Sequence, residues 1–329
     1  MTAASAEPLP PEVERQLEGL APAEVAVSVP TYNNAATIGK IVAAIRAGLE
    51  KHFEGVPAVL INTDAGSSDA TTERLGEAGL PLVRAIHRAP PGELATVPFH
   101  GVPGRGAAIE LSLGVARRLG AKALVVLEAD AVSIDHEWLE RLARPVLERG
   151  ADLVLPVHAR HRYDGTMTNL VLAPLVGALF GRRLHHPFAG ARAMSARLLD
   201  HLAELPWPLP GRGETDLWLT GSAIAADLAV REARLGPWRV ESNTRVTDLP
   251  TMVAQTLGAV FSLMDGYEDL WRGLAAGVPT PAEGAAPPPP GDPVRIDPER
   301  MFGAFQRGLS DLGTIWEQVL APETWGDVL

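Results

Sequence analysis

Glu128 and Asp130 are the residues whose type and spacing point most directly to chemistry. They flank Ala129 and follow the apolar run at residues 123–127, which has the composition of a buried strand. Two carboxylates held this close repel each other unless a cation lies between them. A hard divalent ion such as Mg²⁺ or Mn²⁺ would supply that charge and could also bridge a diphosphate. The alternative interpretation is an exposed acidic turn.

A second polar loop, at residues 64–69, also follows an apolar run. Asp64 could accept hydrogen bonds from a base or from a ribose hydroxyl, and Gly66 permits a tight turn. Asp69, at the far end of the loop, is interpreted as a cap for the next helix.

A third loop, Gly104-Arg105-Gly106, precedes a predicted helix. A flexible backbone, a guanidinium group and the positive end of a helix dipole together suit a phosphate. The alternative is an ordinary connecting loop, because a single G-x-G is a weak signal.

The elements that must position these loops alternate along the first half of the chain. Strands are predicted at residues 25–29, 58–61, 82–86 and 123–127, with helices between them, including one at 107–119. This alternation predicts an α/β protein with a parallel, doubly wound sheet. Ligands gather at the carboxyl edge of such a sheet, so the three polar loops are expected to meet there.

The second half is less regular, with a strand predicted at 151–157, a buried helix at 170–180, and helices at 195–205, 215–226 and 298–320. The last of these is amphipathic and would pack on the body of the protein or on a second subunit. The predicted division is a disordered or extended segment at 1–22, a Rossmann-like subdomain at 23–150, a second subdomain at 151–274, a Pro-rich linker at 275–295 and a helical segment at 296–329.

Composition narrows the function classes. The 329 residues include no cysteine, which excludes disulfides, thiolate metal sites and cysteine nucleophiles, so a metal must bind oxygen or imidazole. The net charge of -11 argues against nucleic acid as a partner. The N-terminal residues lack the features of a signal peptide, and no apolar stretch is long enough to be a transmembrane segment, so a cytoplasmic protein is expected.

Four motifs, in this order and spacing, resemble those of GT-A glycosyltransferases: Pro30-Thr-Tyr-Asn-Asn34, Asp64-Ala-Gly-Ser-Ser-Asp69, Gly104-Arg-Gly106 and Glu128-Ala-Asp130. They are similar to the family's P-x-Y/R-N-E, D-x-G-S-T-D, G-K-G and D-x-D motifs. In the second half, His186-Pro-Phe-Ala-Gly190 and the segment at residues 211–217 resemble glucosyl-3-phosphoglycerate synthases and mannosylglycerate synthases. The resemblance covers residues 25–263 and implies a GT-A nucleotide-sugar-binding sheet with a helical C-terminal acceptor region.

The resemblance implies a donor site for a nucleotide-diphospho-sugar in the first half of the chain. The donor-binding residues would be Pro30, Tyr32, Asn34, Asp64, Gly104, Arg105, Gly106, Glu128 and Ala129. Asp130 and Glu128 would bind Mg²⁺ or Mn²⁺. Glu241 falls near the place of the family's metal-binding histidine and could ligate the ion through oxygen.

The resemblance also implies an acceptor site in the second half. The acceptor-binding residues would be Thr168, Gly190, Thr215 and Asn243, and the catalytic residues Asp130, Glu214 and Asp216. Two of the departures from the donor motifs are Asn34 for the usual glutamate and Glu128 for the first aspartate of D-x-D. Thr166 stands where phosphoglycerate-using relatives carry an arginine, which favours glycerate or another small hydroxylated acid.

The function implied is retaining transfer of a hexose from GDP-mannose or UDP-glucose to a small hydroxy acid such as glycerate or 3-phosphoglycerate. One alternative is an inverting enzyme that uses Asp216 or Glu214 as a carboxylate base. Another is a non-catalytic sugar-nucleotide-binding protein. A nucleotidyltransferase would need a basic Gly-rich loop where residues 30–34 stand. The C-terminal helix offers a surface for a homodimer.

The histidines and tryptophans of the second half are given structural interpretations. The pairs His158 and His161, and His185 and His186, are interpreted as solvated surface, although the first pair, with Arg160 and Arg162, could form a patch for an anionic acceptor. Trp207, Trp218 and Trp238 are assigned to the core. Trp218 is the best candidate among them for stacking on a sugar.

Overall fold

The chain divides into two units, residues 1–290 and residues 291–329. The structure is a computed structural model that describes residues 8–89, 92–93, 101–160, 165–207, 215–240, 249–274, 277–285 and 297–329. The boundary between the units falls inside the segment whose composition predicts a linker.

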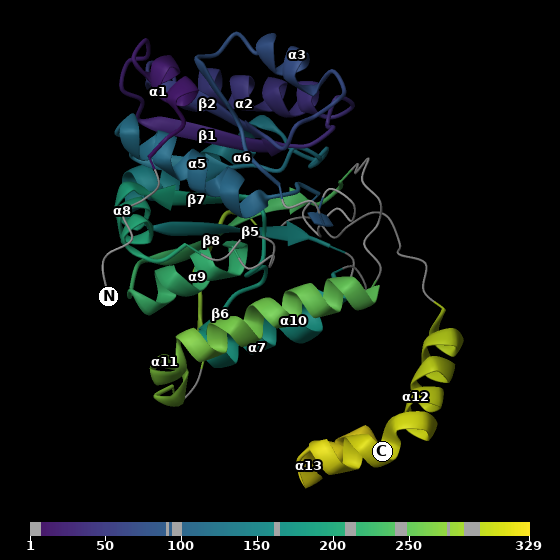
Figure 1. Cartoon of the computed structure of the whole chain (residues 1–329). Coiled ribbons are helices and arrows are strands. Elements are labelled where there is room, and N and C mark those ends of the chain that lie inside the picture. The colour runs from purple at the N-terminus through teal and green to yellow at the C-terminus, as the bar shows by residue number, and fades with distance from the viewer. Residues whose placement is uncertain are drawn as a thin grey trace. The chain divides into compact units, whose positions relative to one another are not determined.

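A central sheet of eight strands forms the body of the first unit (Figure 1). Its strands are β1 (Val25–Thr31), β2 (Ala58–Asp64), β3 (Leu82–Ile86), β4 (Ala123–Val126), β5 (Leu153–Ala159), β7 (Arg192–Ser195), β8 (Val230–Pro237) and β10 (Ala282–Glu283). They lie in the order β10-β8-β5-β7-β4-β1-β2-β3. A separate pair, β6 (Arg182–Arg183) and β9 (Val278–Pro279), forms a small second sheet.

The prediction of a wholly parallel sheet is wrong at β7, which runs antiparallel to both β4 and β5. Met194 of β7 pairs with Leu124 on one side and with Leu153 on the other. Among the described residues between β5 and β7 are two short helical segments and the strand β6, and the chain enters the sheet from its opposite end. The sheet is therefore mixed: β1, β2, β3 and β4 pair in parallel on one side of β7, and β5, β8 and β10 pair in parallel on the other.

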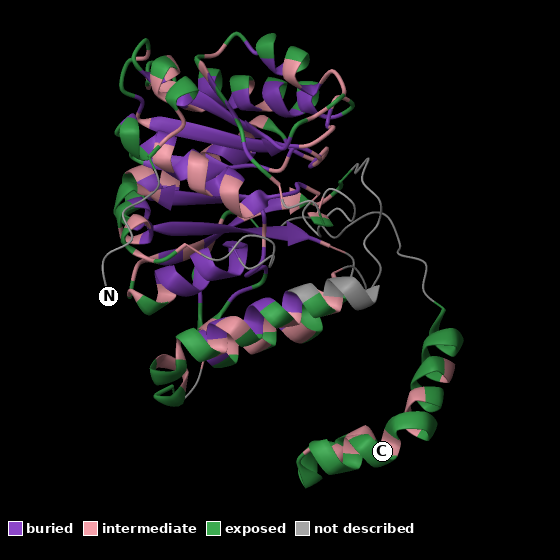
Figure 2. Cartoon of the chain, viewed as in Figure 1, coloured by how far each residue is buried: buried purple, intermediate pink, exposed green. Residues whose placement is uncertain are grey.

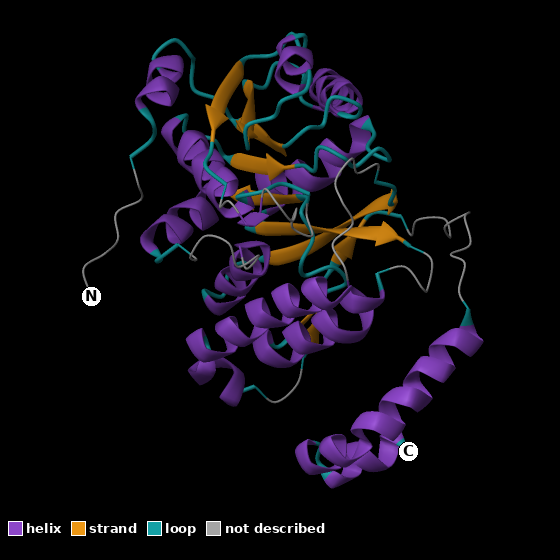
Figure 3. Ribbon diagram, turned by 45° about the vertical axis from the view of Figure 1, so that its right-hand side comes forward, coloured by secondary structure: helices purple, strands orange, loops and turns teal. Residues whose placement is uncertain are grey.

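The helices of the first unit are α1 (Pro11–Leu17), α2 (Ile38–His52), α3 (Thr71–Gly76), α5 (Arg105–Arg118), α6 (His136–Arg149), a π-helix η1 (Thr168–Leu172), α7 (Ala173–Phe180), α8 (Ala196–Glu204), α9 (Thr215–Ala225), α10 (Leu249–Gly266) and α11 (Glu268–Arg272). Figure 3 shows helices on both sides of the sheet. One core cluster joins the sheet to α2, α3 and α6, and the other joins it to α1, α5, α8 and α9.

Burial on both faces explains the near-continuous apolar runs of β1 and β4. Every residue of both strands is buried (Figure 2). Strands covered on two faces lose the alternation of apolar and polar residues, which is why these runs predict parallel strands. The predicted doubly wound α/β architecture is confirmed in this part of the sheet.

The segment 1–22, expected to be disordered or extended, contains helix α1. Val13 and Leu17 are buried in the core cluster that also holds Leu113 of α5. Gln16 accepts a hydrogen bond from the backbone N–H of Arg84 and donates one to its carbonyl, so the helix is tied to the edge strand β3. Tertiary packing orders a helix of this length, which would be marginal alone.

The helix predicted at 170–180 differs from the structure at its start. Residues 168–172 form the π-helix η1, and α7 follows directly. Leu170 is 75% exposed, whereas Val176 and Phe180 are buried. The segment therefore buries one face only. The difference between its buried and exposed faces could not be predicted, because nearly all of its residues are apolar.

The second unit consists of α12 (Pro298–Val319) and α13 (Pro322–Val328). The Asp297 carboxylate accepts a hydrogen bond from the backbone N–H of Arg300, which caps α12 at its start. The predicted amphipathic helix at 298–320 is confirmed to within a residue. Among the residues that the structure describes, no helix is long and apolar enough to cross a membrane.

Candidate active site

Three neighbouring strands bring the predicted donor-site loops to one edge of the sheet. β1 lies between β2 and β4, with Thr31 paired to Asp64 and Ser28 paired to Val126. The backbone N–H of Leu127 donates to the carbonyl of Ser28 at 2.9 Å, so the parallel pairing extends to the residue before Glu128. The loops after β1, β2 and β4 therefore meet at the carboxyl edge, as the sequence predicts.

Glu128 and Asp130 lie in a tight turn directly after β4. The backbone N–H of Ala131 donates to the carbonyl of Glu128 at 3.3 Å. Burial, followed by the nearby Glu128 carboxylate, raises the pKa of Asp130 to about 7, although Arg105 opposes this rise. The two negative charges destabilise each other here, so the pair fits a divalent cation that would neutralise both.

Within the described ranges, no cluster of three or more histidine, aspartate or glutamate side chains could hold a metal ion. Glu241, the predicted third ligand, lies outside those ranges, as do Glu214 and Asn243. The acid pair is the part of the predicted metal site that the structure describes.

Arg105, the first residue of α5, lies beside the acid pair. Its Nε donates to Oδ2 of Asp216 at 2.7 Å, and its Nη2 donates to Oδ1 of Asp216 at 3.3 Å and to the carbonyl of Gly190 at 2.9 Å. Burial alone would lower the pKa of Arg105, but Asp216, with Glu128 and Asp130, raises it overall. A permanent positive charge is therefore held within electrostatic reach of the acid pair.

Asp216, predicted as a catalytic carboxylate, is enclosed by two arginines. Besides Arg105, the side chain of Arg192 reaches it, with Nη2 2.7 Å from Oδ1 and Nη1 donating to the backbone carbonyl of Asp216 at 2.9 Å. The relative exposure of its side chain is 2%, and that of Arg192 is 0%. Both carboxylate oxygens of Asp216 accept hydrogen bonds from guanidinium groups, so this geometry does not suit a general base.

Arg192 completes this cluster and was not predicted. It also donates to the carbonyl of Ala189, so it links the turn at residues 186–190 to the N-terminal end of α9. A fully buried arginine requires a partner, but no strand is predicted at residues 192–195, so nothing in the sequence indicated this burial.

Two glycines permit close approach around this cluster. A Cβ placed on Gly190 would collide with the Oε1 atom of Glu128. A Cβ placed on Gly106 would lie 2.8 Å from Oγ1 of Thr215. The predicted acceptor residues Gly190 and Thr215 therefore lie against the predicted donor residues, and the two halves of the sequence meet at this point.

The residues predicted to line the nucleoside pocket lie around the ends of β1 and β2. Pro30 is buried within β1, Tyr32 is half-buried, and the side-chain oxygen of Asn34 accepts from the backbone N–H of Tyr32 at 2.8 Å. The Asp64 carboxylate is buried, and neighbouring residues of the protein already donate hydrogen bonds to both of its oxygens. It accepts hydrogen bonds from Thr31 Oγ1, Gly66 N, Ser67 N and Ser67 Oγ at 2.6–2.8 Å.

Asp69 lies one residue before Ala70, the N-cap of the next helix, and its side chain bonds to the first turn of that helix and links two loops. Its Oδ1 accepts from the backbone N–H of Thr71, the first residue of α3, at 3.0 Å. Its Oδ2 accepts from the backbone N–H of Ala35 at 3.0 Å. Asp69 therefore holds the loop after β1 against the loop after β2.

His87 lies at the same edge and was not predicted. Its backbone N–H donates to the carbonyl of Asp64 at 3.0 Å, and its ring Nε2 lies 2.7 Å from the carbonyl of Pro103. Gly104 adopts φ +65°, and a Cβ there would lie 3.0 Å from the His87 ring. His87 thus supports the loop before α5; its position directly after β3 was the signal available in the sequence.

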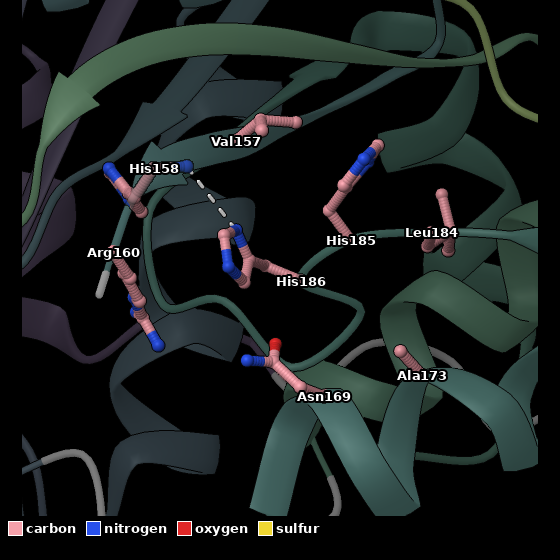
Figure 4. A pocket seen from close by; sticks show the side chains of 8 residues that line it. All are labelled: Val157, His158, Arg160, Asn169, Ala173, Leu184, His185 and His186. Carbon is pink, nitrogen blue, oxygen red and sulfur yellow. Dashed lines mark hydrogen bonds between the residues drawn. The ribbon is translucent and has the colours of Figure 1, made fainter. Parts of the chain in front are cut away.

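The interpretation of the second-half histidines as solvated surface is wrong for His158 and His186, which are both buried. The His158 ring packs on the rings of Trp138 and Trp238, with centroid distances of 5.1 and 4.4 Å. The His186 ring packs on His158 at a centroid distance of 5.7 Å, and both rings line the cavity shown in Figure 4. His185 points to Glu232 instead, with Nδ1 2.8 Å from Oε2. His161 and Arg162 lie outside the described residues.

Trp218 belongs to the core rather than to a sugar platform. It is buried on α9, and its ring meets that of Trp207 edge to face at a centroid distance of 4.9 Å. Thr168, a predicted acceptor residue, is buried at the start of η1.

The mostly parallel sheet, with the acid pair following β4, has the fold of the GT-A glycosyltransferases. A similar solved structure is glucosyl-3-phosphoglycerate synthase from Mycobacterium tuberculosis in complex with Mn²⁺, uridine diphosphate and glucosyl-3-phosphoglycerate, at 25% identity and a TM-score of 0.54, over 78% of this chain and 83% of that chain. The same synthase in complex with Mg²⁺ and uridine diphosphate aligns at 25% identity and a TM-score of 0.55, over the same shares.

No protein-family model and no curated protein matches the chain in sequence. The structural similarity extends through both halves of the first unit and agrees with the resemblance carried by the motifs. The chain is accordingly an enzyme that transfers a hexose.

Proposed function

We propose that this enzyme transfers a hexose from UDP-glucose or GDP-mannose to a small hydroxy acid such as glycerate or 3-phosphoglycerate, with retention of anomeric configuration. The observation that carries the proposal is the acid pair, Glu128 and Asp130, lying beside the buried cation Arg105. Similar synthases have been solved with Mn²⁺, UDP-glucose and glycerol 3-phosphate or phosphoglyceric acid, which supports this donor and acceptor chemistry.

Asp130 and Glu128 would hold the Mg²⁺ or Mn²⁺ ion, with Glu241 as the proposed third ligand. When bound, the ion supplies positive charge that stabilises the departing diphosphate. The raised pKa of Asp130 supports this assignment, because buried, mutually repelling carboxylates favour a cation.

Arg105 is proposed to bind the diphosphate. A guanidinium group carries five N–H donors, and the bonds to Asp216 and Gly190 described above use those on Nε and Nη2. Within the described residues, this leaves the Nη1 hydrogens for a phosphate oxygen. Asp216 and Arg192 are proposed as positioning residues that fix Arg105 and the turn at residues 186–190.

Retention is favoured over inversion by the state of Asp216. An inverting enzyme needs a carboxylate that can accept the proton of the acceptor hydroxyl, and both Asp216 oxygens already accept from arginines. The acceptor hydroxyl is proposed to approach near Gly190 and Thr215, where the two halves of the chain meet. Thr168 and Asn243 are proposed to complete the acceptor site.

The test is transfer from UDP-glucose and GDP-mannose to D-glycerate and 3-phosphoglycerate with Mn²⁺, comparing the wild type with Asp130→Ala. We expect the substitution to lower turnover by about 10²-fold or more, given the size of such electrostatic contributions. Glu54→Gln, at an exposed site after α2, is the control and should leave turnover unchanged.

Product stereochemistry, measured from anomeric coupling in NMR, tests the retaining assignment separately. A wild type that binds nucleotide sugars but neither transfers nor hydrolyses them would contradict the proposed reaction. It would favour a sugar-nucleotide-binding protein instead.

We also propose a homodimer through α12. The apolar side chains Phe302, Phe305, Leu309, Leu312, Trp316 and Val319 recur at alternating spacings of three and four residues along this helix. That repeat forms the seam of a coiled coil, which requires a helix of the same period as its partner. Another copy of α12 meets that requirement.

A further inference from the structure

The turn after β4, which carries the acid pair, bonds partly to itself and partly to a distant segment. The carbonyl of Glu128 accepts a hydrogen bond from the backbone N–H of Ala131 at 3.3 Å. The carbonyl of Asp130 accepts one from the backbone N–H of Val132 at 2.9 Å. The carbonyl of Ala129, which lies between the two acids, has its partner elsewhere in the sequence.

Thr37 supplies that partner from the start of α2. Its Oγ1 atom donates to the carbonyl of Ala129 at 2.6 Å, across 92 residues of sequence, and lies 3.3 Å from the carbonyl of Asn34. A hydroxyl group has one hydrogen to donate, so the shorter contact is the principal bond. Thr37 is 2% exposed and Ala129 is 3% exposed. Because both residues are buried, water does not compete for this bond.

This use of Thr37 differs from the ordinary role of its position. Thr37 is the N-cap residue of α2, where a side chain normally accepts a hydrogen bond from the first turn of its own helix. Asp135, the N-cap residue of α6, does so with the backbone N–H of Glu137 at 2.9 Å. The side chain of Thr37 makes no capping bond. Its hydroxyl therefore serves the turn after β4 rather than its own helix.

The loop after β1 is anchored by bonds that do not use the Thr37 hydroxyl. The backbone N–H of Thr37 donates to the carbonyl of Asn34 at 3.0 Å. The backbone N–H of Asn34 donates to Oγ1 of Thr71 at 2.8 Å, at the start of α3. Asp69 accepts from the backbone N–H of Ala35, as described above. Loss of the Thr37 hydroxyl should therefore release the turn after β4 and leave the loop after β1 in place.

Two other contacts hold the far end of the turn after β4. The Nζ atom of Lys40, one helical turn beyond Thr37, donates to the carbonyl of Val132. The backbone N–H of Ser133 donates to the carbonyl of Arg239 at 3.3 Å, and its hydroxyl accepts from the backbone N–H of Arg239 at 3.0 Å. Both contacts come after the acid pair in the sequence, whereas the Thr37 bond falls between the two acids.

The position of that bond bears directly on Asp130. The carbonyl of Ala129 and the nitrogen of Asp130 belong to one peptide group, which is planar, so a bond that fixes the oxygen also fixes the orientation of that plane. A buried carbonyl that loses its donor is costly and turns toward another partner. Removal of the Thr37 hydroxyl would therefore rotate this peptide and move the Asp130 carboxylate relative to that of Glu128.

We propose that Thr37 is a positioning residue of the donor site. Its hydroxyl sets the distance between the loop after β1, assigned to the nucleoside, and the acid pair, assigned to the metal ion and the diphosphate. This inference rests on the proposed function, because one donor molecule must reach both places. It follows that the gain in nucleotide affinity produced by the metal ion depends on Thr37.

Calorimetric titration of the full-length protein with UDP, and in parallel with GDP, tests the proposal. Each nucleotide is titrated once with Mn²⁺ and once with EDTA, and the ratio of the two affinities measures the coupling between nucleotide and metal. Thr37→Val removes the hydroxyl at nearly constant shape, and Thr37→Ser keeps a hydroxyl. Thr256→Val of α10 is the matched control, because this buried threonine donates to Val253 within its own helix at 3.2 Å.

We expect Thr37→Val to lower the affinity ratio by about 10-fold, as substitutions behind a metal ligand do, while the affinity in EDTA stays unchanged. Thr37→Ser should restore the ratio, and Thr256→Val should keep it. In transfer assays, KM for the nucleotide sugar should rise in Thr37→Val and KM for D-glycerate should not. Equal weakening with Mn²⁺ and with EDTA would mean a purely structural role, and an unchanged ratio would overturn the proposal.

Failure of this inference and failure of the proposed reaction give different results. A wild type with coupled nucleotide and Mn²⁺ binding but no hexose transfer would disprove the reaction and leave the role of Thr37 intact. Hexose transfer together with an unchanged ratio in Thr37→Val would disprove the role of Thr37 alone. A wild type that binds neither nucleotide more tightly with Mn²⁺ would disprove both the metal assignment and this inference.

Discussion

Arg105 and Asp216 form a buried ion pair across 111 residues of sequence, with Nε of the arginine 2.7 Å from Oδ2 of the aspartate. The pair joins the start of α5, in the first half of the chain, to the start of α9, in the second half. Arg192 contributes a second cation to the same carboxylate. This network sets the position of the Gly190 carbonyl and therefore of the turn that lies against Glu128.

Asp216→Asn should destabilise the protein strongly. The substitution leaves two buried guanidinium groups without their shared negative partner, and breaking a buried ion pair from one side costs about 3–5 kcal/mol. Urea denaturation measures this as a lower midpoint. Asp200→Asn is the matched control, because Asp200 pairs with Arg117 at a site where its side chain is 66% exposed. The control should lose less than about 1 kcal/mol, and equal losses in the two variants would refute the prediction.

Arg105→Lys should preserve the positive charge but remove the planar guanidinium group, whose N–H donors bond to both Asp216 and Gly190. We expect kcat/KM for transfer to fall by roughly 10²-fold, a loss typical of one electrostatic donor, while the midpoint of denaturation changes less than in Asp216→Asn. Steady-state kinetics with UDP-glucose and D-glycerate provide the measurement. Arg117→Lys of the same helix is the control, and normal kinetics in Arg105→Lys would exclude a role in transfer.

Gly190→Ala should weaken metal binding. The added Cβ would collide with the Glu128 carboxylate, so either that side chain or the turn must move away from Asp130. Titration of Mn²⁺ followed by electron paramagnetic resonance should show an affinity lower by about 10-fold or more, comparable to other changes around a metal ligand. Gly39→Ala in α2, where nothing lies within 4 Å of the added atom, is the control. Unchanged Mn²⁺ affinity in Gly190→Ala would mean that Glu128 is not a ligand.

Acid should destabilise the fold through His186. Its pKa in the folded protein is about 4, against an ordinary value of 6.5, so between these values the unfolded chain binds a proton that the native state does not. The free energy of unfolding therefore decreases as pH falls from 6.5 to 4, by on the order of 3 kcal/mol from this group. His186→Gln should reduce that slope in anion-free buffer, measured by urea denaturation at each pH. His201→Gln should keep it, and identical slopes for the wild type and His186→Gln would rule out this source.

Phe305→Glu should dissociate the proposed dimer. Phe305 is 43% exposed on α12 and lies in the apolar seam, where a buried charge would oppose association. Light scattering after size-exclusion chromatography should give half the molecular mass of the wild type. Ala304→Glu, one position away and outside the seam, is the control and should remain dimeric. A monomeric wild type would contradict the proposed dimer.

The positions of the donor loops could be predicted because their determinants are local. A buried strand can be recognised in the sequence as an apolar run. Each polar loop directly follows such a strand or precedes the helix that positions it. The order of strands and helices along the chain was therefore enough to place Asp64, Arg105 and the acid pair at one edge of the sheet. The antiparallel β7 could not be foreseen, since four residues of a short strand carry no mark of direction.

What the sequence determined by itself was the α/β class, the edge of the sheet that holds the site, and the carboxylates at the end of β4. The tertiary structure decided which partners those residues have. Asp216, predicted as a catalytic carboxylate, proved to be held by two arginines, and His158 and His186, assigned to solvated surface, proved to be buried. Charge state and burial depend on side chains brought together from distant parts of the chain, and no local pattern records those neighbours.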